Sequence, residues 1–406
     1  MYGIIKDVNK ADVVRIKSKR RIYKIHPISL KRMPDEYNPS ESTGNIVTNL
    51  DIELLKSEVG QHFPFYDMKY GVDSAIFFCR IDETLLENNF DLLRISLSKK
   101  GYIPMLRYEN GEHAIYIIKK PERKKKPIWI NIVLLIATIF TTTLAGSFQW
   151  VSIDNAEIIE MLSPFYILNG FVFFSIPLLL ILGVHEMGHY FASKKHNVEA
   201  SLPYFIPLPP PIFILGTFGA LISTREPIPN RKALLDIGVA GPICGFLVAI
   251  PVSLLGLFFM QQNPILPSSD ADGITIMFPL ILQFLSSFFI IPQNTIIHPT
   301  AFAGWVGLFV TALNLLPVGQ LDGGHVVRAL FKEKSKYITW VVIGAILVLG
   351  LFYTGWFIFF IFIIFLLGTH HPAPLNELQQ LDIKRKLVGL IALIIFVLCF
   401  ASIPMS

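Results

Sequence analysis

The stretch that decides the fold of this 406-residue chain is NGFVFFSIPLLLILGVHEMGHYF, residues 169–191. Its first thirteen residues carry no charge, and two histidines and a glutamate follow shortly after them. Ionisable side chains are costly in lipid, and those found within membrane spans usually serve a function. The stretch therefore predicts a membrane helix that carries a polar site, whose remaining groups must come from elsewhere in the chain.

The composition of the chain also indicates a membrane protein. Hydrophobic residues make up 52% and charged residues only 16%, whereas soluble domains carry roughly 25% charged residues. Of the 35 Lys and Arg residues, 23 lie before residue 128, which predicts a soluble part followed by a membrane part. The net charge of +5 indicates a bias toward one side of the membrane and no nucleic-acid partner, because no basic stripe interleaved with aromatic residues is present.

Three cysteines, Cys79, Cys244 and Cys399, are scattered along the chain. Their odd number and wide spacing indicate neither a disulfide framework nor a cysteine-based metal site. The first twenty residues lack a long apolar core, so we do not expect them to act as a signal peptide.

Two regions are expected before the first long apolar run. Residues 1–45 are polar and basic and are expected to form a flexible segment. Residues 46–120 show the order α-β-β-α-β-β, with a hairpin turn at Asn110-Gly111, which resembles a ferredoxin-like α+β sandwich. The second helix of this domain, within residues 83–101, is expected to bury Leu85, Leu86, Phe90, Leu93 and Leu97. Nothing in the domain indicates catalysis.

The remaining residues, 128–406, predict a polytopic α-helical membrane domain with about seven transmembrane helices. The basic cluster RKKKP at 123–127 precedes the first span and places the N-terminal domain in the cytoplasm. The apolar stretch 276–292 is expected to be a re-entrant or surface element, because a crossing there would break the charge pattern. The expected spans are 128–148, 164–193, 233–260, 300–327, two within 337–368 that split near Tyr353-Thr354-Gly355, and 387–403.

The three ionisable residues of the opening stretch form the pattern H-E-x-x-H. Positions four apart lie on one face of a helix, so His185 and His189 can bind one Zn²⁺ ion. Glu186 lies beside them and can take a proton from a metal-bound water. The alternative is a helix end whose His and Glu residues meet lipid headgroups.

A catalytic zinc site requires a third protein ligand and an open position. Asp322, in the segment ALNLLPVGQLDGGHVVRAL (312–330), is the best candidate, because it lies at the inner end of an apolar span. Pro317, Gly319, Gly323 and Gly324 are expected to break or loosen the helix there. Two alternatives remain open, since Asp322 could cap a helix and His325 could serve as the ligand in its place.

These two motifs together resemble those of the site-2 protease family of intramembrane zinc metalloproteases. The family pattern is matched by HEMGH on one span and by N-x-x-P-x-x-x-x-D-G-G, Asn314 to Gly324, on a later one. The resemblance covers about residues 160–403 and is to the long form with a soluble N-terminal domain. It implies one Zn²⁺ held by His185, His189 and Asp322, with Glu186 as the general base.

The resemblance also implies that the chain hydrolyses peptide bonds in or near transmembrane segments of membrane proteins. Its expected partners are a transmembrane protein substrate and the lipid bilayer, and the oligomeric state is left open. Asn314 matches a position near the active site, where it could position the scissile carbonyl or stabilise the oxyanion, or simply pack between helices. Part of residues 201–223 could form a membrane hairpin that pairs with an unwound substrate, or could be an interfacial connector.

Two other functions use the same residues. A membrane zinc transporter or sensor would use the same ligands but would not need Glu186 as a base, and no internal repeat typical of transporters is found. A non-catalytic scaffold on the same fold is the third possibility. A prokaryotic plasma membrane is the expected location. His370-His371 and His298 are expected to have surface or helix-start roles, and Asp236 is expected to pair with Lys232.

Overall fold

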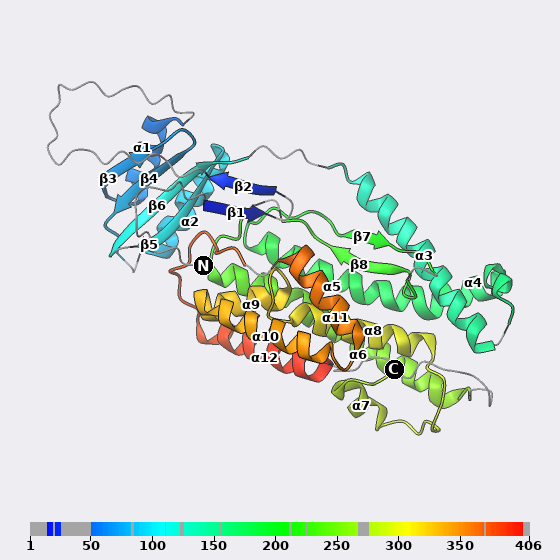
Figure 1. Cartoon of the computed structure of the whole chain (residues 1–406). Coiled ribbons are helices and arrows are strands. Elements are labelled where there is room, and N and C mark those ends of the chain that lie inside the picture. Colours follow the sequence, from blue (N-terminus) through cyan, green and yellow to red (C-terminus); the bar gives the residue numbers. More distant parts are fainter. Residues whose placement is uncertain are drawn as a thin grey trace, which may run out of the picture. The chain divides into compact units, whose positions relative to one another are not determined.

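The computed structural model describes residues 14–18, 21–25, 50–82, 85–109, 111–121, 126–154, 156–210, 213–224, 226–266, 276–368 and 371–400 (Figure 1). The chain divides into two compact units. The first unit combines residues 1–123 with residues 372–379, and the second combines residues 124–371 with residues 380–406. The sequence places 372–379 with the membrane part, whereas the structure packs these residues with the N-terminal unit.

The N-terminal unit is built on a four-stranded antiparallel sheet with the strand order β3-β4-β6-β5. The expected order of two helices and four strands is confirmed. The elements are α1 (Ile52–His62), β3 (Phe65–Tyr70), β4 (Ser74–Cys79), α2 (Leu86–Lys99), β5 (Tyr102–Glu109) and β6 (Glu112–Lys119). The strands β1 (Val14–Ser18) and β2 (Arg21–Ile25) pair with each other, and the rest of the expected flexible segment 1–45 lies outside the described residues.

The core of this unit lies between the sheet and the two helices. Alternate strand residues such as Phe77 and Ile115 are fully buried there, as the period of two in a strand requires. On α2 the expected apolar face is confirmed at Leu86, Phe90, Leu93 and Leu97, whereas the expectation for Leu85 is wrong. Leu85 is 55% exposed because it precedes the first helical residue and so lies off the buried face.

In the second unit, three helices are long and apolar enough to cross a membrane. They are α3 (Trp129–Asp154), the continuous helix Pro164–Lys195, and α6 (Arg231–Gln262). The second of these consists of α4 (Pro164–Gly170), a π-helical turn η2 (Phe171–Ser175) and α5 (Ile176–Lys195). Their positions match three of the expected spans, so the chain is a mostly helical membrane protein, but these helices do not by themselves give the expected count of seven.

The other helices of this unit are shorter. The helix break expected at Pro317 and Gly319 is confirmed, because α8 (Pro299–Leu315) and α9 (Asp322–Phe331) are separate helices, whereas Gly323 and Gly324 lie within α9. The expected split near Tyr353 is confirmed as well, between α10 (Ser335–Leu349) and α11 (Thr354–Phe362). The stretch 276–292 holds only α7 (Leu280–Ser286), which is about 10 Å long and therefore too short to span a bilayer. The remaining elements are η1 (Ile158–Leu162), β7 (Tyr204–Pro207), β8 (Thr217–Leu221), η3 (Lys332–Lys334), η4 (Ile363–Leu367) and α12 (Ile383–Cys399).

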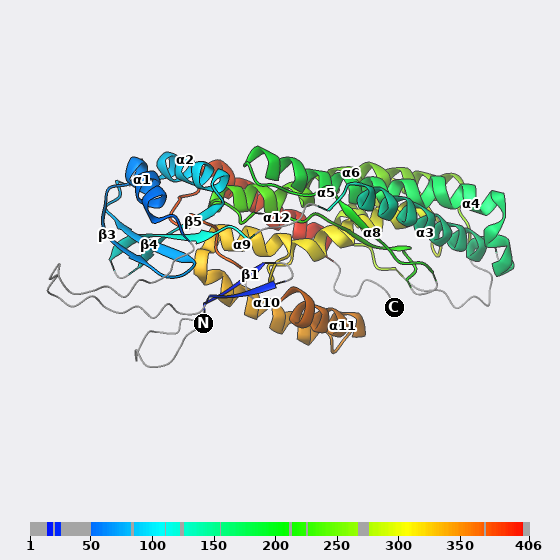
Figure 2. The ribbon, with the colours of Figure 1, turned by 90° about the horizontal axis from the view of Figure 1, so that it is seen from above.

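Helices α5, α6 and α8 run side by side at the centre of this unit (Figures 1 and 2). Small residues let their backbones approach closely, as is common between membrane helices. A Cβ atom on Gly256 of α6 would lie 2.2 Å from the backbone nitrogen of Ala301, and one on Gly307 of α8 would lie 2.8 Å from Ile181 of α5. The close packing of these three helices fixes the position of every residue on their facing sides.

Candidate metal centre

Helix α5 delivers the first half of the site. The helix begins with Pro177 in its first turn and ends with Lys194 and Lys195 in its last turn, where positive charge is favourable. His185, Glu186 and His189 lie between these ends and are only 4%, 7% and 5% exposed, although most of the surrounding residues are apolar. Buried ionisable groups need partners, and those of the two histidines come from α6, α8 and α9.

The break between α8 and α9 delivers the second half. Pro317 has no backbone N–H, and Gly319 has a positive φ of 52° that favours glycine, so the chain turns here before α9 begins at Asp322. A Cβ atom on Gly323 would lie only 1.9 Å from the carbonyl oxygen of Leu315, the last residue of α8. The D-G-G sequence therefore lets the start of α9 lie directly against the end of α8.

Together the two halves form a triangle of metal-ligating atoms. The Nε2 atoms of His185 and His189 are 3.2 Å apart, and Oδ2 of Asp322 is 3.3 Å from the first and 3.1 Å from the second. A tetrahedral Zn²⁺ with ligand distances of 2.0–2.1 Å places its ligand atoms about 3.3 Å apart. The triangle therefore fits three corners of a zinc tetrahedron, and the donor set of two imidazoles and one carboxylate is one that zinc binds.

Helix α6 holds the two histidine rings from behind. The backbone carbonyl of Ile237 lies 2.7 Å from Nδ1 of His189, so it fixes the ring with Nε2 turned toward Asp322. A Cβ atom on Gly241 would lie 2.0 Å from Nε2 of His189, and one on Gly245 would lie 2.9 Å from Nδ1 of His185. The rings thus lie against bare backbone, which only glycine at these two positions allows.

Asn314 of α8 lies at the rim of the triangle. Its Nδ2 atom is 3.3 Å from Nε2 of His185, so the amide lies within reach of any group that binds opposite the ligands. Glu186 lies one position after His185 on the same helix and is buried beside the two ligands. The structure thus places all five residues singled out from the sequence in one cluster.

The alternative ligand His325 lies apart from the triangle. Its Nδ1 atom contacts Nε2 of His371, and the two rings are nearly perpendicular, with an angle of 85° between their planes. Among the described residues, the group of three that can hold a metal is His185, His189 and Asp322. Of the other histidines, His298 accepts a hydrogen bond from the backbone N–H of Thr300 at the start of α8, as its place before that helix predicted.

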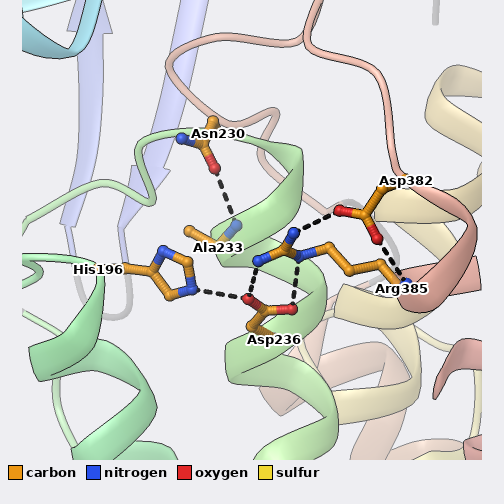
Figure 3. Close-up of polar contacts among 6 residues, drawn as sticks. All are labelled: His196, Asn230, Ala233, Asp236, Asp382 and Arg385. Atoms are coloured by element: carbon orange, nitrogen blue, oxygen red, sulfur yellow. Dashed lines mark hydrogen bonds and ion pairs between the residues drawn. The ribbon is translucent and has the colours of Figure 1, made fainter. Parts of the chain in front are cut away.

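Asp236 of α6 has partners that sequence reasoning missed. Its carboxylate accepts two hydrogen bonds from the guanidinium of Arg385 on α12, at 2.9 and 2.7 Å, and also contacts Nε2 of His196 at 2.9 Å (Figure 3). The sequence had suggested Lys232, four residues earlier on α6, as the partner of Asp236. No sequence signal pairs Asp236 with Arg385, which lies 149 residues later.

The Gly residues of α6 and the carbonyl of Ile237 were also not singled out. A signal for the glycines exists in the sequence, because Gly238, Gly241 and Gly245 recur at helical spacing in GVAGPICG (238–245). The same spacing places one bare face of α6 toward α5 and α9. The role of the Ile237 carbonyl depends on which residue the helix packing brings opposite it, so it has no signal of its own.

The chain is similar in sequence to one peptidase family and to several probable zinc metalloproteases. Residues 173–351 match peptidase family M50. The probable chloroplastic zinc metalloprotease EGY1 of Arabidopsis thaliana is 32% identical over 247 residues, which are 57% of this chain and 44% of that protein. The probable chloroplastic zinc metalloprotease EGY2 of Oryza sativa subsp. indica is 29% identical over 273 residues, which are 64% of this chain and 47% of that protein.

The chain spans less than half the length of these relatives. A third, the probable chloroplastic zinc metalloprotease EGY3 of Oryza sativa subsp. indica, is 29% identical over 249 residues, which are 54% of this chain and 40% of that protein. No solved structure matches the chain. The names of all three relatives place them in the chloroplast, which does not fit the expectation of a prokaryotic plasma membrane.

Proposed function

We propose that the chain is a member of the site-2 protease family, a zinc metalloprotease that cuts transmembrane proteins, and the match of residues 173–351 to peptidase family M50 supports this proposal. The proposed reaction is hydrolysis of a peptide bond in or near a membrane span of the substrate. The observation that carries the proposal is the triangle of His185, His189 and Asp322, whose sides of 3.1–3.3 Å fit one zinc ion. Its position on α5 and α9, among apolar helices, supports cleavage within the membrane.

Zinc bound at this triangle would polarise the scissile carbonyl and make water a stronger nucleophile at neutral pH. The chain's own residues supply the proton transfers. Glu186 takes a proton from the attacking water and then gives it to the nitrogen of the peptide bond. The bond therefore breaks with a neutral amine as the leaving group and not a negatively charged one. Glu186 is buried on α5 directly after the ligand His185, which supports its role in these proton transfers.

Asn314 is proposed to position the substrate. Its amide N–H donates a hydrogen bond to the oxygen of the scissile carbonyl, which gains negative charge as water attacks. The distance of 3.3 Å between Nδ2 and the His185 ring places this donor on the rim of the ligand triangle. A donor held on a packed helix costs little reorganisation when charge develops.

The strands β7 and β8 pair with each other antiparallel, and this hairpin is proposed to hold the substrate in an extended form. A transmembrane helix hides its carbonyls in hydrogen bonds, so it must unwind before the scissile bond can be attacked. Strand β7 lies against α3, where the side chain of Asn131 donates to the carbonyls of Leu202 and Pro203. We therefore assign the substrate to the outer edge of β8, which follows the turn at Gly216.

The membrane arrangement is also a proposal. Helices α3, α4–α5 and α6 make three crossings, α8 with α9 makes a fourth, α10 and α11 make two short ones, and α12 makes a seventh. Helices α8 and α12 have 17 residues each, the lower limit for a span. The basic residues before α3 place the N-terminal domain on the cytoplasmic side.

The test is cleavage by the purified chain in lipid vesicles that contain a protein with a single transmembrane helix. We expect cleavage to stop when a chelator removes zinc, to return when zinc is added back, and to fall within the membrane span when the products are mapped by mass spectrometry. Cleavage that a chelator leaves unchanged would contradict the proposal. Transfer of zinc across the vesicle membrane without any cleavage would favour a transporter.

A further inference from the structure

The loop between α11 and α12 contributes a strand-like segment to the N-terminal unit. The backbone N–H of Leu106, in the middle of the edge strand β5, donates to the carbonyl of Leu375 at 2.8 Å. Leu106 also forms a parallel bridge with Asn376. Edge strands present unpaired backbone groups, and natural proteins often cover them. Here the cover comes from residues 372–379, which lie more than 250 positions further along the chain.

Side chains make this docking specific. The Nη1 atom of Arg107 donates to the carbonyls of Pro374 and Leu375, at 3.1 and 2.9 Å. Leu375 is buried within the core of the N-terminal unit and is only 4% exposed. The side chain of Asn376 is also buried, and its oxygen accepts hydrogen bonds from the backbone N–H groups of Leu378 and Gln379. The segment is therefore an integral part of this unit.

The chain that precedes the segment leads to the helix of the third metal ligand. His371 immediately precedes residue 372, and its Nε2 atom contacts Nδ1 of His325 on α9. His325 lies one helical turn after Asp322 and packs against α6, since a Cβ atom on Gly238 would lie 2.7 Å from the Cβ of His325. A displacement of His371 therefore acts on the first turn of α9.

The chain that follows the segment leads to α12, which side-chain contacts link to α6 and to the end of α5, the helix of the other two ligands. Asp382 caps α12 by accepting a hydrogen bond from the backbone N–H of Arg385 at 2.9 Å. The guanidinium of Arg385 binds Asp236 of α6, and Asp236 in turn contacts His196, the residue directly after α5 (Figure 3). Helix α5 carries His185 and His189, so both ends of the loop reach helices that hold the metal ligands.

We propose that residues 372–379 couple the N-terminal domain to the metal centre. The segment is fixed to β5. His371 directly precedes it, and only residues 380 and 381 separate its last residue, Gln379, from Asp382. Two residues span at most about 7 Å when fully extended, so a movement of the segment is passed on to the chain on both sides of it. A partner that binds the N-terminal domain and shifts the β5 edge therefore moves the first turn of α9 and the contact of α12 with α6, and with them the triangle of ligands.

The test measures hydrogen exchange and zinc release in the full-length chain, and neither readout depends on peptide cleavage. The variant Arg107→Ala removes the two hydrogen bonds to the segment, and Arg80→Ala is its matched control, because Arg80 lies just after β4 and is exposed. In Arg107→Ala we expect exchange in 372–379 to rise at least about tenfold, with faster exchange in α9 and zinc release that is several times faster. In Arg80→Ala we expect none of these changes.

A second set of variants separates coupling from simple loss of folding. Four-residue Gly-Ser insertions after His371 and after Gln379 lengthen both connections and leave the docked segment intact. In this background Arg107→Ala should still loosen residues 372–379 but should no longer affect α9 or zinc release. Faster exchange in 372–379 with unchanged α9 and zinc release in the original chain would overturn the proposal, and so would an effect on α9 that survives the insertions.

Discussion

His189 and Asp322 lie 133 residues apart in the sequence, and the Nε2 and Oδ2 atoms of their side chains are 3.1 Å apart. This contact joins α5 to the start of α9 and brings an imidazole and a carboxylate to the spacing that one zinc ion requires. Both side chains are well shielded from solvent, with 7% and 16% of their surface exposed. Zinc binding at the site should therefore depend on this pair.

Replacing the carboxylate ligand should weaken zinc binding without unfolding the membrane unit. In Asp322→Asn the amide keeps the shape of the side chain but loses the charge that faces the two histidines. We expect the zinc affinity to fall by more than about 100-fold, a loss at least as large as that caused by mutating groups that only orient a ligand. Competition with a zinc chelator in detergent solution measures it. An unchanged affinity would mean that Asp322 is not a ligand.

The glycine face of α6 gives a second prediction. In Gly241→Ala the new methyl group would lie 2.0 Å from Nε2 of His189, so the ring must move out of the ligand triangle. We expect loss of zinc and of cleavage. The matched control is Gly344→Ala in α10, where a Cβ atom has no neighbour within 4 Å and alanine favours the helix. Equal zinc content in the two variants would contradict the close contact between Gly241 of α6 and the His189 ring.

A third prediction concerns the polar network at Asp236. Arg385→Ala removes the two hydrogen bonds to this carboxylate, while its contact with His196 remains. The groups are partly exposed, so we expect a loss of about 1 kcal/mol and a lower Tm. Arg385→Lys keeps the charge but not the paired geometry and should recover only part of the loss. Lys384→Ala, at an exposed neighbouring position, is the control. If its Tm were as low as that of Arg385→Ala, the contact of Arg385 with Asp236 would not be the cause of the loss.

The fourth prediction is a pH dependence of the N-terminal unit. Hydrogen bonds from Lys100 and then Ser96 hold the pKa of the Glu58 carboxyl below its ordinary value of 4.5, despite its burial. A group whose pKa is lowered on folding stabilises the folded state above its unfolded pKa, and this stability is lost as the pH falls through the lowered pKa. The protection of α1 and α2 against hydrogen exchange, taken relative to the intrinsic exchange rate at each pH, should therefore fall as the pH falls below about 4.5.

Glu58→Gln removes this pH dependence. The variant should be less stable than the natural chain at neutral pH and nearly equal to it in acid. Glu53→Gln is the control. The Glu53 side chain is 85% exposed, and its ion pair with Lys56 lies on the surface of the unit. If the variant kept the full acid sensitivity of α1 and α2, another group would be responsible.

Local patterns in the sequence predicted much of the fold and most of the site. The spacing of His185 and His189 requires only that the segment is helical, and the helix break before Asp322 follows from Pro317 and Gly319, which disfavour a continuous helix whatever surrounds them. The strands and helices of the N-terminal unit likewise follow from short-range periodicity. These features depend on residues that lie close together in the chain.

The features that were missed depend on which distant segments meet. The Ile237 carbonyl orients His189 only because α5 packs on α6 at that height. Asp236 binds Arg385 because α12 returns to the same end of α6, and Leu375 enters the core of the N-terminal unit from the loop between α11 and α12. A local pattern contains no information about such pairings, since the chain can place any of several residues opposite a given position.

The role of Glu186 as the base of a zinc protease is best tested with the variant Glu186→Gln. Cleavage of a single-span membrane protein and zinc content are measured in the same sample. The amide of Gln cannot accept a proton from water, so we predict a cleavage rate at least about 100-fold below that of the natural chain. Glu186 is not assigned as a metal ligand, so we predict that the variant still binds one zinc ion per chain. The exposed Glu157→Gln should cleave normally. Cleavage by Glu186→Gln at the natural rate, with zinc bound, would contradict the assignment of Glu186 as the base of a zinc protease.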